Sequence, residues 1–205
     1  MKTENEFLQR GIAVEYVSLA WMAVECTVAL YSGVVAWSLA LLAFGGDSFV
    51  ELLSSFAVVQ HLRNTSTTRA TRGGHVEAKR IEWVTALLLV SLIPMIGLVM
   101  VYSFLSGLKP ESSSIGIAVA IGAVVIMPIL WHEKKVIGTR ANCLPLTIDA
   151  AESATCFWMS VALLSSLVIN YFWRVPWIDY AATLVILAFV AKEAREALES
   201  IRQVC

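Results

Sequence analysis

Length, composition and charge exclude an ordinary soluble domain. The chain has 205 residues, 58% of them hydrophobic, and its 15 basic and 16 acidic residues give a formal net charge of −1. Soluble domains are about 45–50% apolar, so the composition indicates a membrane protein.

Six apolar segments follow one another along the chain. They cover residues 12–34, 36–61, 83–106, 114–131, 144–172 and 176–191. Several exceed the ~20 residues that a helix needs to span hydrocarbon, and they lack the alternating pattern of a transmembrane barrel. The sequence therefore predicts an all-α membrane protein, with six transmembrane helices in one domain over residues 1–205.

Basic residues gather on one side of the predicted membrane. They precede the first segment, lie between the second and third, and follow the fourth and sixth, where Lys134 and Lys135 come after the fourth. The opposite side keeps only Lys109 and Arg174. The positive-inside rule then predicts a multi-pass integral membrane protein with both termini in the cytoplasm.

Acidic side chains lie inside these apolar segments or at their margins, and no Lys or Arg is expected among them. The six acids are Glu15, Glu25, Asp47, Glu51, Asp149 and Glu152. A carboxylate in hydrocarbon costs several kcal/mol or more unless it meets a cation, a proton or water. Glu15 is close enough to the cytoplasmic end to reach water. The others indicate a pathway for cations.

Two pairs of these residues have helical spacing. Asp47 and Glu51 in the second segment, and Glu152 and Cys156 in the fifth, are each four residues apart and so share one helix face. Counting ~1.5 Å per residue from the cytoplasmic ends places both pairs roughly 12–22 Å deep. Together they could form a tetrahedral site for a divalent ion such as zinc, unless Cys156 is only a small packing residue.

These two segments resemble the cation diffusion facilitator family. Residues 38–51 are similar to the family's second helix, where a Ser-x-Ala-Leu segment leads to an Asp-x-x-x-Asp metal pair. Residues 149–156 are similar to its fifth helix, where an Asp-Ala start precedes a His-x-x-x-Asp pair. The resemblance implies a cation-efflux-type bundle. It also implies the metal ligands Asp47, Glu51, Glu152 and Cys156.

Departures from the family pattern bear on the metal. Three of the four ligand positions differ from the family's Asp, Asp, His, Asp set, and we expect a divergent member that lacks the usual C-terminal cytoplasmic domain. Carboxylates favour harder ions such as Mn²⁺, whereas a thiolate favours Zn²⁺ or Cd²⁺. The resemblance implies a secondary transporter that exports divalent transition-metal ions from the cytoplasm by proton antiport. Zn²⁺ is the expected ion, with Mn²⁺, Fe²⁺, Cd²⁺ and Co²⁺ as alternatives.

Two further acids are expected to serve this site. Asp149 and Glu25 could support the ligands or relay protons. The expected partners are the metal ion, protons and the lipid bilayer; a homodimer stays open, and neither a cofactor nor nucleic acid is expected. The chain is not expected to be an enzyme. An intramembrane carboxylate-dependent enzyme and a non-transporting metal-binding or sensing subunit remain the alternatives.

Overall fold

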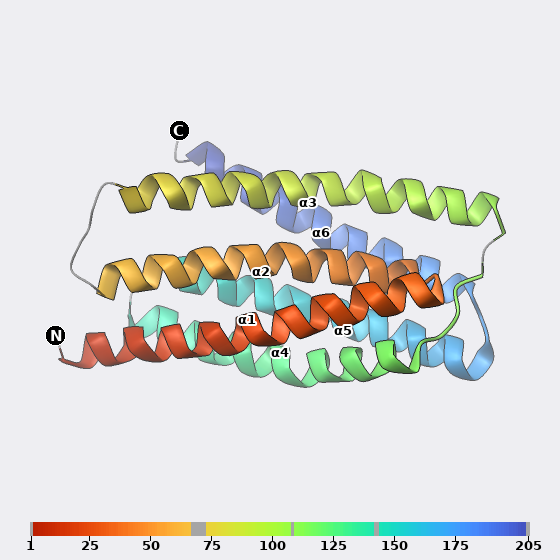
Figure 1. Ribbon diagram of the computed structural model, residues 1–205, viewed down its shortest axis with the longest axis horizontal. Helices are drawn as coiled ribbons and strands as arrows, with labels where there is room; N and C mark the ends of the chain where they lie inside the picture. Colours follow the sequence, from red (N-terminus) through yellow and green to blue (C-terminus); the bar gives the residue numbers. More distant parts are fainter. Residues whose placement is uncertain (1, 67–72, 108, 142–143, 204–205) are drawn as a thin grey trace.

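The computed structural model describes residues 2–66, 73–107, 109–141 and 144–203, and within these ranges it contains helices and no strand. The six helices are α1 (Lys2–Ala36), α2 (Leu39–Ser66), α3 (Gly73–Leu105), α4 (Ser114–Arg140), α5 (Leu144–Trp173) and α6 (Trp177–Gln203). They lie along the long axis of one bundle (Figure 1). The predicted all-α class and six-helix bundle are confirmed.

The bundle has two distinct ends. α1 begins and α6 finishes at one of them, which we call the terminal end (Figure 1). At the other, the turn end, short connections join α1 to α2 and α5 to α6. Several helices continue at the terminal end beyond the predicted apolar segments: α4 runs to Arg140 and α6 to Gln203.

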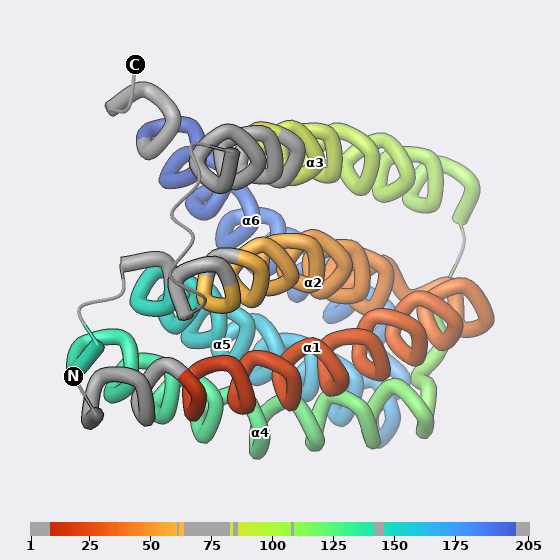
Figure 2. Tube along the Cα trace, turned by 60° about the vertical axis from the view of Figure 1, so that its left-hand side comes forward, coloured from red at the N-terminus to blue at the C-terminus, as the bar shows by residue number. Residues whose placement is uncertain are grey.

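Five helices in the described part of the chain are long and apolar enough to cross a membrane. Their apolar stretches are Gln9–Ala36, Leu39–Gln60, Ala86–Leu105, Ser114–Arg140 and Leu146–Trp173. Helix α6 is not among them, because charged residues from Lys192 onward interrupt its second half. It is nevertheless part of the bundle, since it packs against α2, α3 and α5 (Figure 2).

Helix α2 lies at the centre of the bundle, in contact with α1, α3, α5 and α6. Two glycines permit the closest approaches. A Cβ added at Gly45 would lie 3.0 Å from the backbone nitrogen of Leu30 on α1, and one at Gly46 would lie 2.8 Å from Leu92 Cδ1 on α3. Small residues let helix backbones approach closely in membranes. Asp47, the next residue, is therefore enclosed and has no exposed surface.

Hydrogen bonds at the turn end fasten α6 to α2. Asp179, in the first turn of α6, accepts hydrogen bonds from Ser38 Oγ at 2.5 Å and from the Leu39 backbone N–H at 2.9 Å. Ser38 Oγ in turn accepts from the Leu41 N–H at 3.2 Å. The free N–H groups at the start of α2 are thus capped by both side chains. Both helices run from this shared point toward the terminal end, side by side.

Candidate metal site

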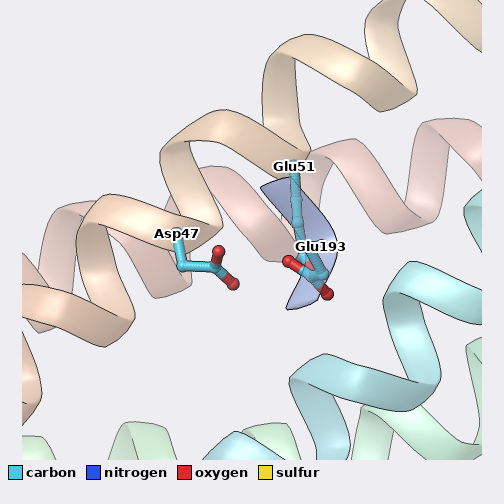
Figure 3. A group of neighbouring side chains, drawn as sticks. All are labelled: Asp47, Glu51 and Glu193. Carbon is cyan, nitrogen blue, oxygen red and sulfur yellow. The ribbon is translucent and has the colours of Figure 1, made fainter. Parts of the chain in front are cut away.

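Three carboxylates from α2 and α6 converge in the interior of the bundle. Asp47 and Glu51 come from successive turns of α2, and Glu193 comes from α6 (Figure 3). One ligand atom from each residue lies within 4.8 Å of the others. All three side chains are buried. We call this group the carboxylate cluster.

Five of the six oxygen atoms of this cluster lack a hydrogen-bond partner among the described residues. Both oxygens of Asp47 and of Glu51, and Oε1 of Glu193, are buried and accept no hydrogen bond from any described residue. Buried polar atoms without a partner are costly, and like charges at this spacing repel each other. A divalent cation bound between the carboxylates would give these oxygens a partner and reduce the repulsion, and so would protons shared among the carboxylates.

Glu193 was missed by the sequence analysis, which ended the sixth apolar segment at residue 191. Helical spacing provides the signal that could have found it. Glu193 follows Ile186 by seven residues and Val190 by three, and both of these are fully buried. Its neighbours Lys192 and Glu196 form an exposed ion pair at 3.5 Å on the other face of α6.

The two predicted ligands on α5 lie outside this cluster. Glu152 is partly buried and accepts a hydrogen bond from Ser54 Oγ at 3.5 Å, while its Oε2 has no donor among the described residues. Cys156 is fully buried, and its thiol donates to Glu25 Oε1 at 3.5 Å. The structure therefore brings together Asp47 and Glu51 but not Glu152 or Cys156. Coordination by these last two residues remains a prediction.

Glu25 is held by hydrogen bonds from three helices. Besides the Cys156 thiol of α5, it accepts from Trp21 Nε1 of α1 and from Ser48 Oγ of α2, each at 2.7 Å. Ser48 is adjacent to Asp47 in the sequence. Glu25 is fully buried, and its hydrogen bond with Ser48 links α1 to α2 beside the carboxylate cluster.

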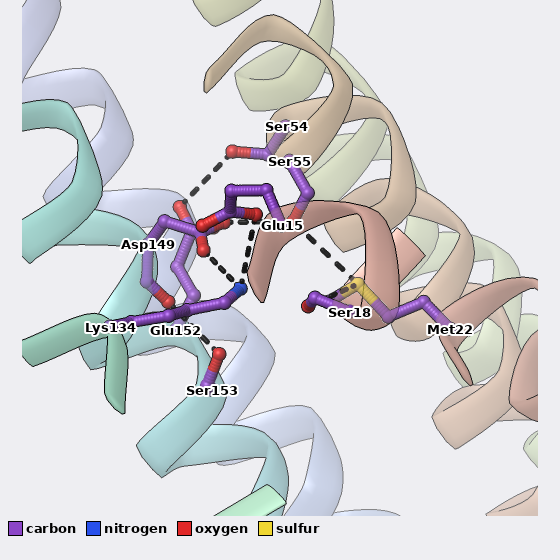
Figure 4. Close-up of polar contacts among 9 residues, drawn as sticks. All are labelled: Glu15, Ser18, Met22, Ser54, Ser55, Lys134, Asp149, Glu152 and Ser153. Atoms are coloured by element: carbon purple, nitrogen blue, oxygen red, sulfur yellow. Dashed lines mark hydrogen bonds and ion pairs between the residues drawn. The ribbon is translucent and has the colours of Figure 1, made fainter. Parts of the chain in front are cut away.

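A second polar group surrounds Lys134, which lies near the end of α4 (Figure 4). The Lys134 ammonium contacts the Asp149 carboxylate and lies 3.4 Å from Glu15 Oε2. We call Glu15, Lys134 and Asp149 the lysine cluster. The expectations that Glu15 reaches water and that no basic residue lies among the acids are wrong. Glu15 and Lys134 have no exposed surface.

Helical spacing also explains the position of Lys134. The buried residues Met127, Leu130 and Ile137 of α4 occur at intervals that place them on the same face as Lys134. Because α4 continues to Arg140, this face still points into the bundle where Lys134 occurs. Lys134 is basic, but it occupies a position on the buried face of α4.

Hydrogen bonds from α2 reach the lysine cluster and Glu152 on α5. Asp149 accepts from Ser55 Oγ at 2.8 Å, and Ser55 lies one helical turn beyond Glu51 on α2. Its neighbour Ser54 donates to Glu152, one turn beyond Asp149 on α5. The hydroxyls of Ser54 and Ser55 therefore place polar groups at the α2–α5 contact, beside Asp149 and Glu152 (Figure 4).

A comparison with protein families identifies the family of this chain. The family model described as the cation efflux transmembrane domain matches residues 16–203, which is nearly the whole chain. No curated protein matches the chain. The matched range includes both pairs of residues that the sequence analysis singled out and also Glu193. The chain therefore belongs to the cation efflux family and is a membrane transporter of metal cations.

Proposed function

We propose that this protein exports a divalent transition-metal ion from the cytoplasm, in exchange for protons, by way of the carboxylate cluster. The observation that supports this proposal is the convergence of Asp47, Glu51 and Glu193, where both oxygens of Asp47 and Glu51 and Oε1 of Glu193 have no donor among the described residues. Family membership supports the transport of metal cations. Binding at this cluster, exchange with protons and the direction of transport are our additions.

The spacing of the cluster suits one ion. Carboxylate oxygens bind Zn²⁺ at about 2.0–2.2 Å, so two oxygens that share an ion lie at most about 4.4 Å apart. Ligand atoms within 4.8 Å of one another need only a small adjustment to reach that geometry. A divalent ion would balance two of the three neighbouring negative charges and so offset part of the cost of burying them.

Exchange with protons follows from the chemistry of these ligands. A carboxylate must lose its proton to bind a metal ion, so protons and metal ions compete for Asp47, Glu51 and Glu193. Protons entering from the outer side would release the ion there, and their departure to the cytoplasm would restore the empty site. Alternating access requires helices that carry the site to move relative to the others.

The donor atoms suggest which ions are carried. The carboxylate cluster offers oxygen alone, whereas the Cys156 thiol is hydrogen-bonded to Glu25 in this arrangement. Oxygen donors suit Mn²⁺ and Fe²⁺ and also bind Zn²⁺. We propose that Zn²⁺, the ion predicted from the sequence, is carried together with these harder ions.

Proteoliposomes test transport directly. With the purified chain in vesicles, we expect uptake of Zn²⁺, Mn²⁺ or Fe²⁺ to rise when the lumen is made acidic, because protons leaving the lumen drive the ion inward. A panel of divalent ions at set pH gradients gives the selectivity. Vesicles containing the Asp47→Asn variant serve as the matched control. Metal binding without flux would instead support a non-transporting subunit, and lipid or peptide cleavage would support an enzyme.

Replacing Cys156 tests its predicted role as a ligand. Cys156→Asp removes a soft donor and adds a hard one, so we expect transport of Zn²⁺ and Cd²⁺ to fall relative to Mn²⁺, by roughly tenfold. Competition between ions in the same vesicles measures this ratio. Cys156→Ser is the control, since its hydroxyl keeps a donor for Glu25. An unchanged ion profile in Cys156→Asp would assign Cys156 to packing.

A further inference from the structure

The lysine cluster has more acid than a structural ion pair needs. One ammonium is shared by two carboxylates, so the group carries one uncompensated negative charge when all three residues are ionised. Oε1 of Glu15 is buried and accepts no hydrogen bond from any described residue. Buried ion pairs contribute little net stability even when charges balance, and an unpaired buried charge is costly. The second carboxylate therefore calls for another explanation.

The position of the lysine cluster suggests an explanation for its second carboxylate. Lys134 lies six residues before the end of α4, and Asp149 lies five residues after the start of α5. At ~1.5 Å per residue, both are roughly 8–9 Å inside the terminal ends of their helices. Asp149 accepts a hydrogen bond from Ser55, which lies one helical turn from Glu51 on α2, and the neighbouring Ser54 donates to Glu152. An ion travelling from the terminal end to the carboxylate cluster along α2 and α5 would pass Lys134.

We propose that Glu15 and Asp149 form an entrance site for the transported divalent cation, and that the Lys134 ammonium fills this site between ions. The lysine is a tethered cation, and an incoming divalent ion displaces it because the ion neutralises both carboxylates where the ammonium neutralises one. The tether keeps the entrance occupied when no metal is present. This inference rests on the proposed function only for the direction in which ions pass.

Binding measurements can isolate the entrance site from the carboxylate cluster. In a chain carrying Asp47→Asn, Glu51→Gln and Glu193→Gln, the carboxylate cluster is neutral. We expect this background chain to bind Mn²⁺ only weakly in equilibrium dialysis, because the ion has to displace the Lys134 ammonium from the entrance. Adding Lys134→Met should tighten this binding to one Mn²⁺ per chain, and adding Asp149→Asn to that variant should remove it.

The wild-type chain supplies a test that does not depend on a variant folding. An amine-reactive acylating reagent should modify Lys134 faster when saturating Mn²⁺ or Zn²⁺ is present, since the displaced ammonium leaves its carboxylates. The exposed Lys135 is the internal control and should react equally in both conditions. Mass spectrometry of the digested chain reports both sites.

The possible results separate this inference from the proposed function. If Lys134→Met in the neutral background binds no Mn²⁺ while retaining its helical circular dichroism, the entrance site is overturned. If that variant does not fold, unchanged acylation of Lys134 on metal addition overturns it. Loss of the proposed function would appear elsewhere, as an absence of metal flux in vesicles containing the wild-type chain.

Discussion

Asp47→Asn should abolish metal flux and metal-dependent proton movement together. Asp47 is fully buried, and its oxygens accept no hydrogen bond from a described residue, so the similarly shaped amide breaks no hydrogen bond that supports the fold. It does remove a metal ligand and a proton carrier. Loss of groups that merely support a ligand costs about 10–100-fold in metal affinity or activity, and loss of a ligand should cost at least as much.

Proteoliposomes containing a metal indicator and a pH dye would measure both fluxes at once. The exposed Glu111, near the turn end, provides a control: Glu111→Gln also neutralises an acid but should transport normally. Full metal transport by Asp47→Asn would remove the carboxylate cluster from the mechanism. A wild-type metal flux without any proton signal would require antiport to be abandoned.

Glu193→Gln should weaken metal binding by at least about 10–100-fold, whereas Glu196→Gln should leave it unchanged. Both changes neutralise a glutamate on α6, three residues apart. Glu193 is buried beside Asp47 and Glu51, while Glu196 is exposed and pairs with Lys192. An exposed pair of that kind contributes at most about 1 kcal/mol to stability. The comparison therefore separates coordination from a general effect of charge.

Equilibrium dialysis with Zn²⁺ and Mn²⁺ would give the affinities of both variants. Equal affinity in wild type and Glu193→Gln would exclude α6 from the site. In that case the ligand set predicted from the sequence, in which α5 supplies Glu152 and Cys156, would be the better description.

The sequence was informative where a single helix carries the pattern. The i, i+4 spacing of Asp47 and Glu51 is a property of α2 alone, and the structure places both side chains in one cluster. Whether Glu152 and Cys156 meet that pair depends on the rotation and the axial position of α5 against α2. Neither quantity is encoded in local spacing, so the four-residue site could be predicted but not established.

Glu193 and Lys134 lie outside the predicted apolar segments for a different reason. Those segments end at residues 131 and 191, whereas α4 continues to Arg140 and α6 to Gln203. The helical spacing of buried residues continues past the end of each apolar segment. Glu193 follows Val190 on the buried face of α6, and Lys134 lies between the buried Leu130 and Ile137 on α4. Following the period beyond the apolar segment would have found both residues.

The tie between Asp179 and the start of α2 restricts how the protein can change shape. Because α2 and α6 are fastened there, they can swing as a single lever about the turn end. Glu193 lies 14 residues from Asp179, or roughly 21 Å along the helix, so a tilt of about 10° would displace it by about 4 Å. The ligands of both helices would travel together. The ion would keep its coordination during this movement, and the contacts that α2 and α6 make with the surrounding helices would change instead.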